Sequence, residues 1–589
     1  MKALAWLNKY FWKYRLRLFS GILFIGFSTW FSLVPANLVG KGIDFATWAT
    51  KHPEIPADTI TSILLRFGLE VIAYTLAYGV FLFLNRQTII VMSRLIEYDL
   101  KNEIFDHYQK LDQRFYKQNN TGDLMNRISE DVSRVRMYIG PAVMYTTSTA
   151  ITLIMTIMFM FSSDVRLALY VLAPLPILTI SIYYVSNRIN RKSLKVQQQL
   201  SQLSTNAQET FSGVRVIKAF AREKNTEQQF GQAANEYMTR TLSLARTESM
   251  FQPFMLLLIG LSILLTVLIG GREVIDGKLS VGTIATFILF VIRLTWPIAS
   301  LGWVTSLVQR AAASQERINE FLKTAPAIKS STTEPFELRG DIEFRNVRFV
   351  YPDSGIKALD GISFTVKAGQ SAAFLGRTGS GKSTLAQLMV RLYDVSEGEI
   401  LVDGRDIRKV NLNDLREAAG YVPQEVFLFS ETISGNIAFS AHDLREIGTR
   451  RNEIEQAAKD AAIHSNILEF PQAYETLVGE RGVTLSGGQQ QRISIARAIL
   501  KHPKLLIFDD CLSAVDTETE DEILGNLRRI MHGKTTIIIS HRVSAVRNAD
   551  QIFILDEGKI IEQGTHQELL DAGKHYADLY NKQVQELQR

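Results

Sequence analysis

The sequence predicts an α-helical membrane domain followed by a cytosolic α/β domain built around a phosphate-binding loop. Three observations support this fold class. The first 310 or so residues contain long, almost uncharged apolar runs. Alternating strand and helix patterns begin near Gly340, and a glycine-rich loop stands there between an apolar strand and a helix. Apolar runs of this length are typical of membrane spans, whereas the second pattern is typical of a soluble α/β fold.

Six segments are long and apolar enough to cross a bilayer, which takes about 20 residues. Four of them carry no charge, and the other two hold one charge each, Glu70 and Arg293. The predicted spans are Phe19–Gly40, Phe67–Leu84, Met137–Ser163, Leu167–Asn187, Ser249–Gly271 and Leu279–Val308. Buried helices of soluble proteins rarely stay uncharged for so long, so we predict six transmembrane helices and a lipid bilayer as partner.

The stretch before the first span predicts an amphipathic helix that lies in the membrane interface. Residues 4–16 combine basic side chains with Trp6, Tyr10, Phe11, Trp12 and Tyr14, which suit the headgroup depth. We therefore assign residues 1–18 to an interfacial helix. These residues and the segments after the second and fourth spans are rich in Lys and Arg, which places both termini and the α/β domain in the cytoplasm. The expected location is an inner or plasma membrane.

Two long cytoplasmic segments separate the second span from the third and the fourth from the fifth. They contain few prolines and predict helices, such as Arg94–Gln113 and Lys192–Glu209, which would reach about 40 Å below the membrane. Short amphipathic stretches with a glycine breaker form their tips, at Thr121–Val132 and Phe211–Glu223. The predicted domains are a membrane domain at 19–322, a linker at 323–339 and the α/β domain at 340–589.

The composition excludes some classes of function. The net charge is +5 in 589 residues, with 46% hydrophobic residues, and no Lys/Arg tract is interleaved with aromatic residues. Nothing therefore indicates binding to nucleic acid. Cys511 is the only cysteine, so an intrachain disulfide is impossible and a packing role is expected for it.

The glycine-rich loop matches the pattern G-x-x-x-x-G-K-[ST]. A predicted strand, Ser371–Leu375, precedes it, and a predicted helix, Leu385–Tyr393, follows. Backbone N–H groups of such a loop cradle phosphates, the lysine reaches the β- and γ-phosphates, and the serine hydroxyl binds Mg²⁺. The residues of the predicted phosphate site are Gly376, Arg377, Thr378, Gly379, Ser380, Gly381, Lys382, Ser383 and Thr384.

With this loop, the chain resembles an ATP-binding cassette exporter half-transporter over nearly its whole length. The resemblance implies a P-loop ATPase domain with a helical subdomain, which binds ATP and Mg²⁺. It also gives roles to further motifs, which follow in the family's order. They are Tyr351 for adenine stacking, Gln424 of the Q-loop for Mg²⁺, Ser486, Gly487, Gly488 and Gln489 of the LSGGQ signature, Asp509 for Mg²⁺, Asp516 of the D-loop and His541 as the switch histidine. The two tips resemble coupling helices.

In the family, two cassettes enclose two ATP molecules, so the resemblance implies a second half-transporter as partner. Ser486 and Gly488 would then donate to the γ-phosphate bound on the other subunit. The resemblance also implies export, and soft Met and aromatic side chains in the spans suit hydrophobic drugs or lipids as cargo. Arg293 inside the sixth span meets cargo or a headgroup, or pairs with Glu70; the sequence leaves these alternatives open.

The residue after Asp509 departs from the family's pattern. Asp510 stands where the family usually has a glutamate that orients or deprotonates the attacking water. The aspartate keeps the carboxylate but loses about 1.5 Å of reach, which predicts slow hydrolysis with intact ATP binding. We favour a heterodimer in which this chain builds the slow site. The alternatives are a homodimeric flippase of the lipid-A type and a nucleotide-gated channel or regulator with little turnover.

Overall fold

The computed structural model describes residues 2–441, 450–479, 485–511 and 517–587. The chain forms two compact units. One contains residues 1–109 and 122–324, and the other contains residues 110–121 and 325–589. The short segment 110–121 thus belongs to the second unit, although it lies between helices of the first. Each unit is described by itself.

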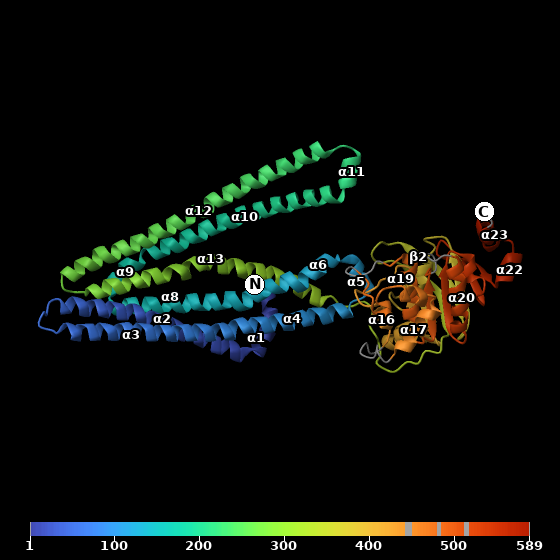
Figure 1. Ribbon diagram of the computed structural model, residues 1–589, viewed down its shortest axis with the longest axis horizontal. Coiled ribbons are helices and arrows are strands. Elements are labelled where there is room, and N and C mark those ends of the chain that lie inside the picture. The colour runs from blue at the N-terminus through green and yellow to red at the C-terminus, as the bar shows by residue number, and fades with distance from the viewer. Residues whose placement is uncertain (1, 442–449, 480–484, 512–516, 588–589) are drawn as a thin grey trace. The chain divides into compact units, whose positions relative to one another are not determined.

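Long helices make up the first unit (Figure 1). In chain order they are α1 (Asn8–Lys13), α2 (Arg15–Ala49), α3 (Ala57–Asn85), α4 (Val91–Lys110), α6 (Thr121–Asn126), α7 (Val132–Met137), α8 (Val143–Ser163), α9 (Val165–Leu172), α10 (Pro174–Ser212), α11 (Val214–Ala219), α12 (Glu223–Ile275) and α13 (Val281–Lys323). A 3-10 turn, Lys2–Leu7, precedes them, and π-helical turns at Arg86–Ile90, Arg127–Asp131 and Tyr138–Ala142 join several of them.

In the described part of the chain, five helical stretches are long and apolar enough to span a membrane. They coincide with five of the six predicted spans. The fourth predicted span, Leu167–Asn187, runs over α9 and the beginning of α10, which meet at Ala173. The φ of −56° and ψ of −36° at Ala173 are helical, and the apolar helix Val165–Ile177 continues across it. Pro174 and Pro176, at the beginning of α10, lack backbone N–H groups, so they cannot donate helical hydrogen bonds at this junction.

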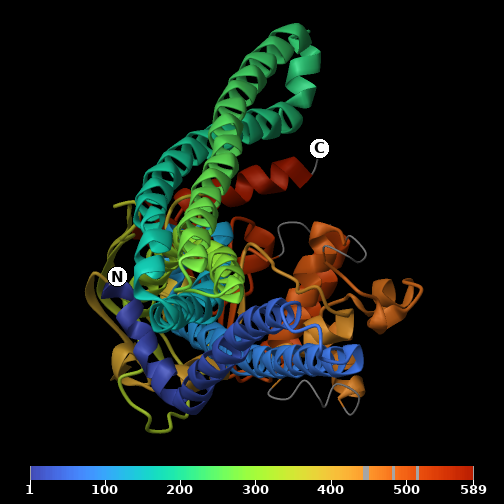
Figure 2. The same ribbon diagram turned by 90° about the vertical axis from the view of Figure 1, so that its left-hand side faces the viewer.

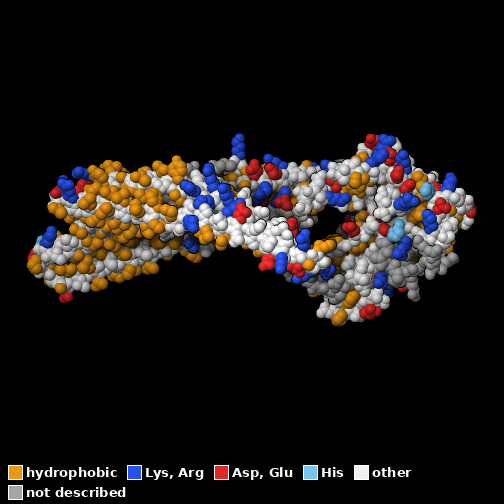
Figure 3. All heavy atoms as spheres, turned by 90° about the horizontal axis from the view of Figure 1, so that it is seen from above, with side chains coloured by type: hydrophobic (Ala, Val, Ile, Leu, Met, Phe, Trp, Pro, Cys, Tyr) orange, Lys and Arg blue, Asp and Glu red, His pale blue; other side chains and the backbone are white. Residues whose placement is uncertain are grey.

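The outer surface of this unit suits a bilayer. Hydrophobic side chains gather over the helices in the space-filling view (Figure 3). On α3 the exposed apolar residues recur every three or four positions, so they share one face. They are Leu65, Leu69, Ile72, Leu76, Val80 and Phe83. The N-terminal segment also meets the expectation in part: Trp12 is 69% exposed, but Tyr10 is buried and donates to Glu103 of α4.

Close contacts fix the helices of the first unit against one another. Asp44 of α2 accepts hydrogen bonds from Gly282 N at 2.6 Å and from Ser280 Oγ at 2.7 Å, at the beginning of α13. A Cβ atom on Gly282 would lie 2.0 Å from the carbonyl oxygen of Gly40, so only glycine allows this approach. Further along α13, Arg317 and Ser314 bind the buried carboxylate of Asp131.

The helices α10 and α12 run side by side as a long hairpin, which α11 closes at its tip (Figures 1 and 2). Helix α10 includes the predicted helix Lys192–Glu209, and the tip Phe211–Glu223 contains α11. The other predicted tip, Thr121–Val132, contains α6. Both tips therefore carry the short helices that the sequence predicts.

The second unit has the α/β architecture predicted for it. Its strands are β1 (Ile342–Val350), β2 (Lys357–Val366), β3 (Ser371–Gly376), β4 (Glu397–Val402), β5 (Arg405–Asp406), β6 (Ala419–Val422), β7 (Leu505–Asp509), β8 (Thr535–Ser540), β9 (Gln551–Asp556) and β10 (Lys559–Gly564). Its helices are α5 (Gln113–Gln118), α14 (Lys382–Met389), α15 (Leu412–Ala418), α16 (Ile433–Ala438), α17 (Arg451–Asp460), α18 (His464–Leu468), α19 (Gly487–Leu500), α20 (Thr517–Met531), α21 (Val543–Val546), α22 (His566–Asp571) and α23 (His575–Leu587). Single 3-10 turns lie at Ile407–Lys409 and Ala473–Glu475.

The strands form two sheets. One has the order β2-β1-β4-β5 and is antiparallel, and the other has the order β10-β9-β3-β8-β7-β6. In the second sheet, the neighbours β3, β8, β7 and β6 are parallel. Strands β3, β7 and β8 are buried nearly throughout, which explains their continuous apolar sequences. Because these four strands point the same way, the residues that follow each strand lie at the same edge of the sheet.

Candidate nucleotide site

The phosphate-binding loop follows β3 and leads directly into α14. Two of its glycines, Gly379 and Gly381, have φ angles of +85° and +100°, which other residues rarely adopt. Gly381 is also packed tightly, because a Cβ atom there would lie 2.4 Å from the carbonyl oxygen of Ala358. Arg377 and Thr378 lie between β3 and Gly379, Ser380 lies between the two glycines, and Thr384 lies in the first turn of α14.

Lys382 and Ser383 open helix α14. The Lys382 ammonium donates to the carbonyl oxygens of Gly376 and Arg377, both at 2.8 Å, so it lies over the loop itself. Burial lowers the pKa of Lys382, and the carboxylates of Asp510 and Asp509 oppose this shift. A triphosphate in the loop would replace the two carbonyl oxygens with stronger acceptors for the same ammonium.

The hydroxyl of Ser383 donates to Asp509 Oδ1 at 2.8 Å, across from β3 to the end of β7. Asp509 is 1% exposed, and burial raises its pKa to about 6, while hydrogen bonds from Ser383 and Tyr421 oppose the shift. A hydroxyl and a carboxylate are the hard oxygen ligands that Mg²⁺ prefers, and Mg²⁺ keeps several waters or phosphate oxygens besides. Ser383 and Asp509 therefore fit an Mg²⁺ ion that is bound together with a nucleotide.

Asp510 lies next to the other two predicted catalytic side chains. Its carboxylate contacts His541 Nδ1 at 2.9 Å and accepts a long hydrogen bond, 3.5 Å, from Gln424 Nε2. Gln424 follows β6 and His541 follows β8, so the parallel strand order explains why they meet. Asp510 itself has a φ of +49°, and its N–H donates to the Ile539 carbonyl at 2.8 Å. The contacts to His541 and Gln424 hold the carboxylate itself in place.

Sequence reasoning did not identify two side chains that support this cluster. Gln583 of α23 donates to the carbonyl oxygen of His541 at 2.9 Å and accepts from Val543 N at 2.7 Å, which fixes the turn after β8. Tyr421 of β6 interacts with Asp509. Tyr421 stands three residues before the predicted Q-loop residue Gln424, and this short spacing was the sequence signal that could have pointed to Tyr421. No local signal points to Gln583, which lies 42 positions beyond His541.

The signature residues lie at the beginning of α19. Ser486 caps this helix: its hydroxyl accepts from Gln489 N at 3.3 Å, and the Gln489 side chain accepts from Ser486 N at 3.0 Å. Ser486 and Gly487 are exposed, and Gly488 is partly exposed. The N-terminus of α19 is therefore open to solvent at this cap, and a helix N-terminus attracts anions. The predicted D-loop residue Asp516 lies outside the described residues.

Tyr351, the residue predicted to stack on adenine, follows β1. Its hydroxyl is hydrogen-bonded to Thr384 Oγ1 at 2.9 Å, which places the ring beside α14 and close to the phosphate-binding loop. Phe349 and Tyr393 pack edge-on against the ring, with centroids at 4.9 and 5.6 Å. An aromatic face near the loop suits a purine base whose phosphates enter the loop.

Comparisons with known proteins agree with this geometry. Residues 16–298 match the family described as "ABC transporter transmembrane region", and residues 359–513 match "ABC transporter". A probable multidrug resistance ABC transporter ATP-binding/permease protein of Bacillus subtilis is 34% identical, over 99% of this chain and 97% of that one. The chain belongs to the ABC transporter family.

Other relatives support the same assignment. The multidrug resistance-like ATP-binding protein MdlA of Escherichia coli is 33% identical over 99% of this chain and 97% of its own. An ATP-dependent lipid A-core flippase of Syntrophus aciditrophicus is 36% identical over 83% of this chain and 80% of its own. A bacterial Atm1-family ABC exporter, solved with ATP bound, superposes with a TM-score of 0.80 at 29% identity, over 97% of this chain and 99% of that chain.

As a member of this family, the chain is a multi-pass membrane protein whose ATPase domain couples ATP hydrolysis to transport. Family membership also implies a dimer, because ABC exporters combine two half-transporters.

Arg293 lies in the predicted sixth span, where the sequence left its partner open. Its Nε is buried and has no hydrogen-bond partner within the described residues, and Glu70 pairs with Arg66 at 3.1 Å.

Proposed function

We propose that this chain exports or flips hydrophobic or amphipathic compounds, drugs or lipids, as one half of a heterodimeric exporter. Its own phosphate-binding loop would build a slow ATP site, and its signature would complete the fast site on the partner. The observation that carries the proposal is the convergence of Lys382, Ser383, Asp509, Asp510 and His541 at one sheet edge, with aspartate at the position of the base. Relatives named as multidrug transporters and lipid flippases support the cargo class.

The proposed division of labour rests on what each side chain can reach. Lys382 and the N–H groups of the loop would bind the triphosphate, and Ser383, Asp509 and Gln424 would hold Mg²⁺, which supplies charge neutralisation at the phosphates. Asp510 would orient the attacking water, and His541 already contacts that carboxylate at 2.9 Å. A shorter carboxylate that is bound to His541 stands farther from a γ-phosphate than a glutamate would, which supports a slow step.

The tip of the α10–α12 hairpin supports a second subunit. Phe211, Phe220 and Val216 are 75%, 74% and 61% exposed there. Phe211 also lines a groove of about 350 Å³, together with Val214, Ile217 and Phe230. A solvated tip rarely exposes so many large apolar side chains unless another protein covers them. We infer that the tip docks on the partner's cassette and that both termini are cytoplasmic.

For cargo, Arg293 is the candidate contact in the membrane domain. A cation within a span is costly unless an anion or a cavity accompanies it, so its unpartnered Nε supports contact with an anionic headgroup or an acidic group of the cargo. The lipid-A type of homodimer remains the second candidate, supported by the flippase relatives.

Vectorial transport decides between these functions and a regulator. The chain would be reconstituted in proteoliposomes, alone and together with a similar half-transporter that carries Glu at the base position. ATP-dependent movement of a fluorescent lipid or a dye, with Lys382→Ala as the blank, supports an exporter. Movement by the chain alone would favour the homodimer. Ion conductance without cargo movement would contradict export and favour a nucleotide-gated channel.

A further inference from the structure

The segment 110–121 connects helices of the membrane unit, yet it is attached to the ATPase unit. Asp112 explains the attachment. One of its carboxylate oxygens accepts from Phe115 N at 3.4 Å and caps α5, and the other accepts from Ala327 N at 2.6 Å. Helix α5 is therefore held at its N-terminus by the stretch of chain that follows α13.

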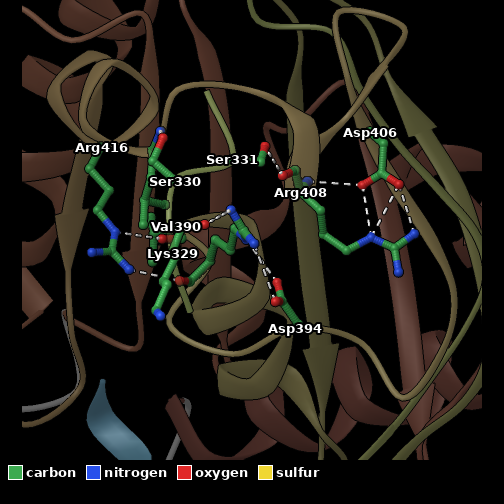
Figure 4. A network of polar contacts seen from close by, with 10 residues as sticks. Lys329, Ser330, Ser331, Val390, Asp394, Asp406, Arg408 and Arg416 are labelled. Atoms are coloured by element: carbon green, nitrogen blue, oxygen red, sulfur yellow. Dashed lines mark hydrogen bonds and ion pairs between the residues drawn. The ribbon is translucent and has the colours of Figure 1, made fainter. Parts of the chain in front are cut away.

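That stretch is in turn bound to the ATPase unit (Figure 4). The Lys329 carbonyl accepts from Arg391 Nη1 at 3.2 Å, and the Ser331 hydroxyl donates to the Arg408 carbonyl at 2.7 Å. Ser330 Oγ accepts from Leu412 N at 3.2 Å. Because three successive residues are fixed in this way, the position of α5 follows from the ATPase unit.

Near the end of α5, Lys117 stands over the ring of Tyr351. Its ammonium lies 4.9 Å from the centroid of Tyr351 and 5.4 Å from that of Tyr393. Both distances are within the range of cation–π attraction, which is about 6 Å. Asp353, two residues after Tyr351, adds a favourable charge interaction with Lys117. The cation therefore covers the aromatic ring that is expected to receive the adenine base.

We propose that Lys117 is a nucleotide-binding residue that contacts the base end of ATP. The inference rests on the proposed function, because it requires ATP to stack on Tyr351. The ammonium lies over the ring, 4.9 Å from its centroid, whereas a base stacked on that face would lie about 3.5 Å above the ring. A base that enters there would therefore displace the ammonium from the ring to the edge of the base, where it would contact the base. Lys117 thus adds a cation to an otherwise aromatic site, and it comes from the connection between two helices of the membrane domain.

The structure also gives this contact a consequence. The residues after Lys117 lead within four positions into α6, the predicted coupling helix. A base that engages Lys117 therefore restrains the chain directly before α6. Occupancy of the adenine end would be transmitted along this segment as well as through the Q-loop.

The test compares ATP with inorganic tripolyphosphate, which has the phosphates but no base. Binding of each to the full chain in lipid discs, in EDTA to prevent hydrolysis, would be measured for wild type, Lys117→Met and Lys117→Arg. Lys117→Met keeps the apolar stem and removes the charge. We expect it to weaken ATP binding about two- to fivefold, the size of an exposed cation–π contact, and to leave tripolyphosphate unchanged. Lys117→Arg should bind ATP like wild type.

The matched control is Lys110→Ala, an exposed lysine at the end of α4 in the same segment, which should bind both probes like wild type. Unchanged ATP binding by Lys117→Met would overturn the inference. So would an equal loss for both probes, because the lysine would then act only as a general positive charge. Failure of wild type to bind ATP, or normal binding by Lys382→Ala, would instead contradict the proposed function.

Discussion

Replacing Asp510 with glutamate tests the proposed slow site most directly. The carboxylate of Asp510 now lies 2.9 Å from His541 Nδ1 and at the limit of hydrogen bonding, 3.5 Å, from Gln424 Nε2. One more methylene moves the carboxylate about 1.5 Å outward. A displacement of about 1 Å from the productive position can cost about 100-fold in rate. We therefore expect Asp510→Glu to raise turnover roughly 10- to 100-fold, or about 1.4–2.7 kcal/mol in activation free energy.

The same substitution should leave ATP affinity almost unchanged. Lys382, Ser383 and Asp509 make the contacts expected to hold the nucleotide and Mg²⁺, and none of them depends on the length of residue 510. A small loss of stability is expected, because the φ of +49° at Asp510 is a conformation that suits aspartate better than glutamate. The gain should thus be seen in the maximal rate and not in the ATP concentration at half-maximal rate.

The assay is hydrolysis of Mg-ATP by the purified chain in lipid discs, measured over a range of ATP concentrations. Lys382→Ala is the blank, and Asp510→Asn, which has the same size without the charge, is the matched control. Asp510→Asn should be no faster than wild type. If wild type is already fast and Asp510→Glu is equal or slower, Asp510 is a competent base and the argument from reach is refuted.

Three further predictions concern the same site. Gly381→Ala should abolish binding of a fluorescent ATP analogue, because its Cβ would lie 2.4 Å from the Ala358 carbonyl at a φ of +100°; normal binding would contradict this. Ser486→Ala should lower the melting temperature through loss of a helix cap worth about 1 kcal/mol, with the exposed Ser465→Ala of α18 as a serine control; an unchanged melting temperature would argue against the cap. In Mg²⁺-free buffer, raising the pH from about 4 through 6 should lower the thermal stability of wild type relative to Asp509→Asn. The raised pKa of Asp509 makes the folded state bind more protons than the unfolded state in that pH range. Parallel pH profiles of the two melting temperatures would refute this prediction.

Sequence patterns predicted the parts of the site that are local. The loop from Gly376 to Thr384 is recognisable because its glycines, lysine and serine lie within nine positions, between a strand and a helix. The meeting of Asp510 with Gln424 and His541 was implied only through resemblance. The order β3-β8-β7-β6 brings them together, and no spacing in the sequence encodes that order. Domain boundaries and orientation remain predictions.

The contacts that escaped prediction join residues far apart in the chain. Lys117 and Tyr351 are 234 positions apart, and the segment that carries Lys117 looks like an ordinary turn between two helices. Its attachment depends on a hydrogen bond from a backbone N–H, that of Ala327, which has no side-chain signature. The junction of α9 and α10 at Ala173, by contrast, has a visible cause in the sequence, because Pro174 and Pro176 follow it.

In the proposed dimer, a defect at the catalytic residues and a defect at the signature residues would affect different ATP sites. Asp510 contacts His541 and Gln424 within one unit of its own chain. Ser486 is exposed and Gly488 is partly exposed at the beginning of α19, where the proposed function would make them available to a nucleotide held by another chain. On the proposed function, an aspartate at the base position would weaken only the site on this chain, whereas the intact cap at Ser486 would serve the other. Such a chain would contribute fully to a dimer whose partner supplies the glutamate, and the proposed heterodimer therefore accounts for both features.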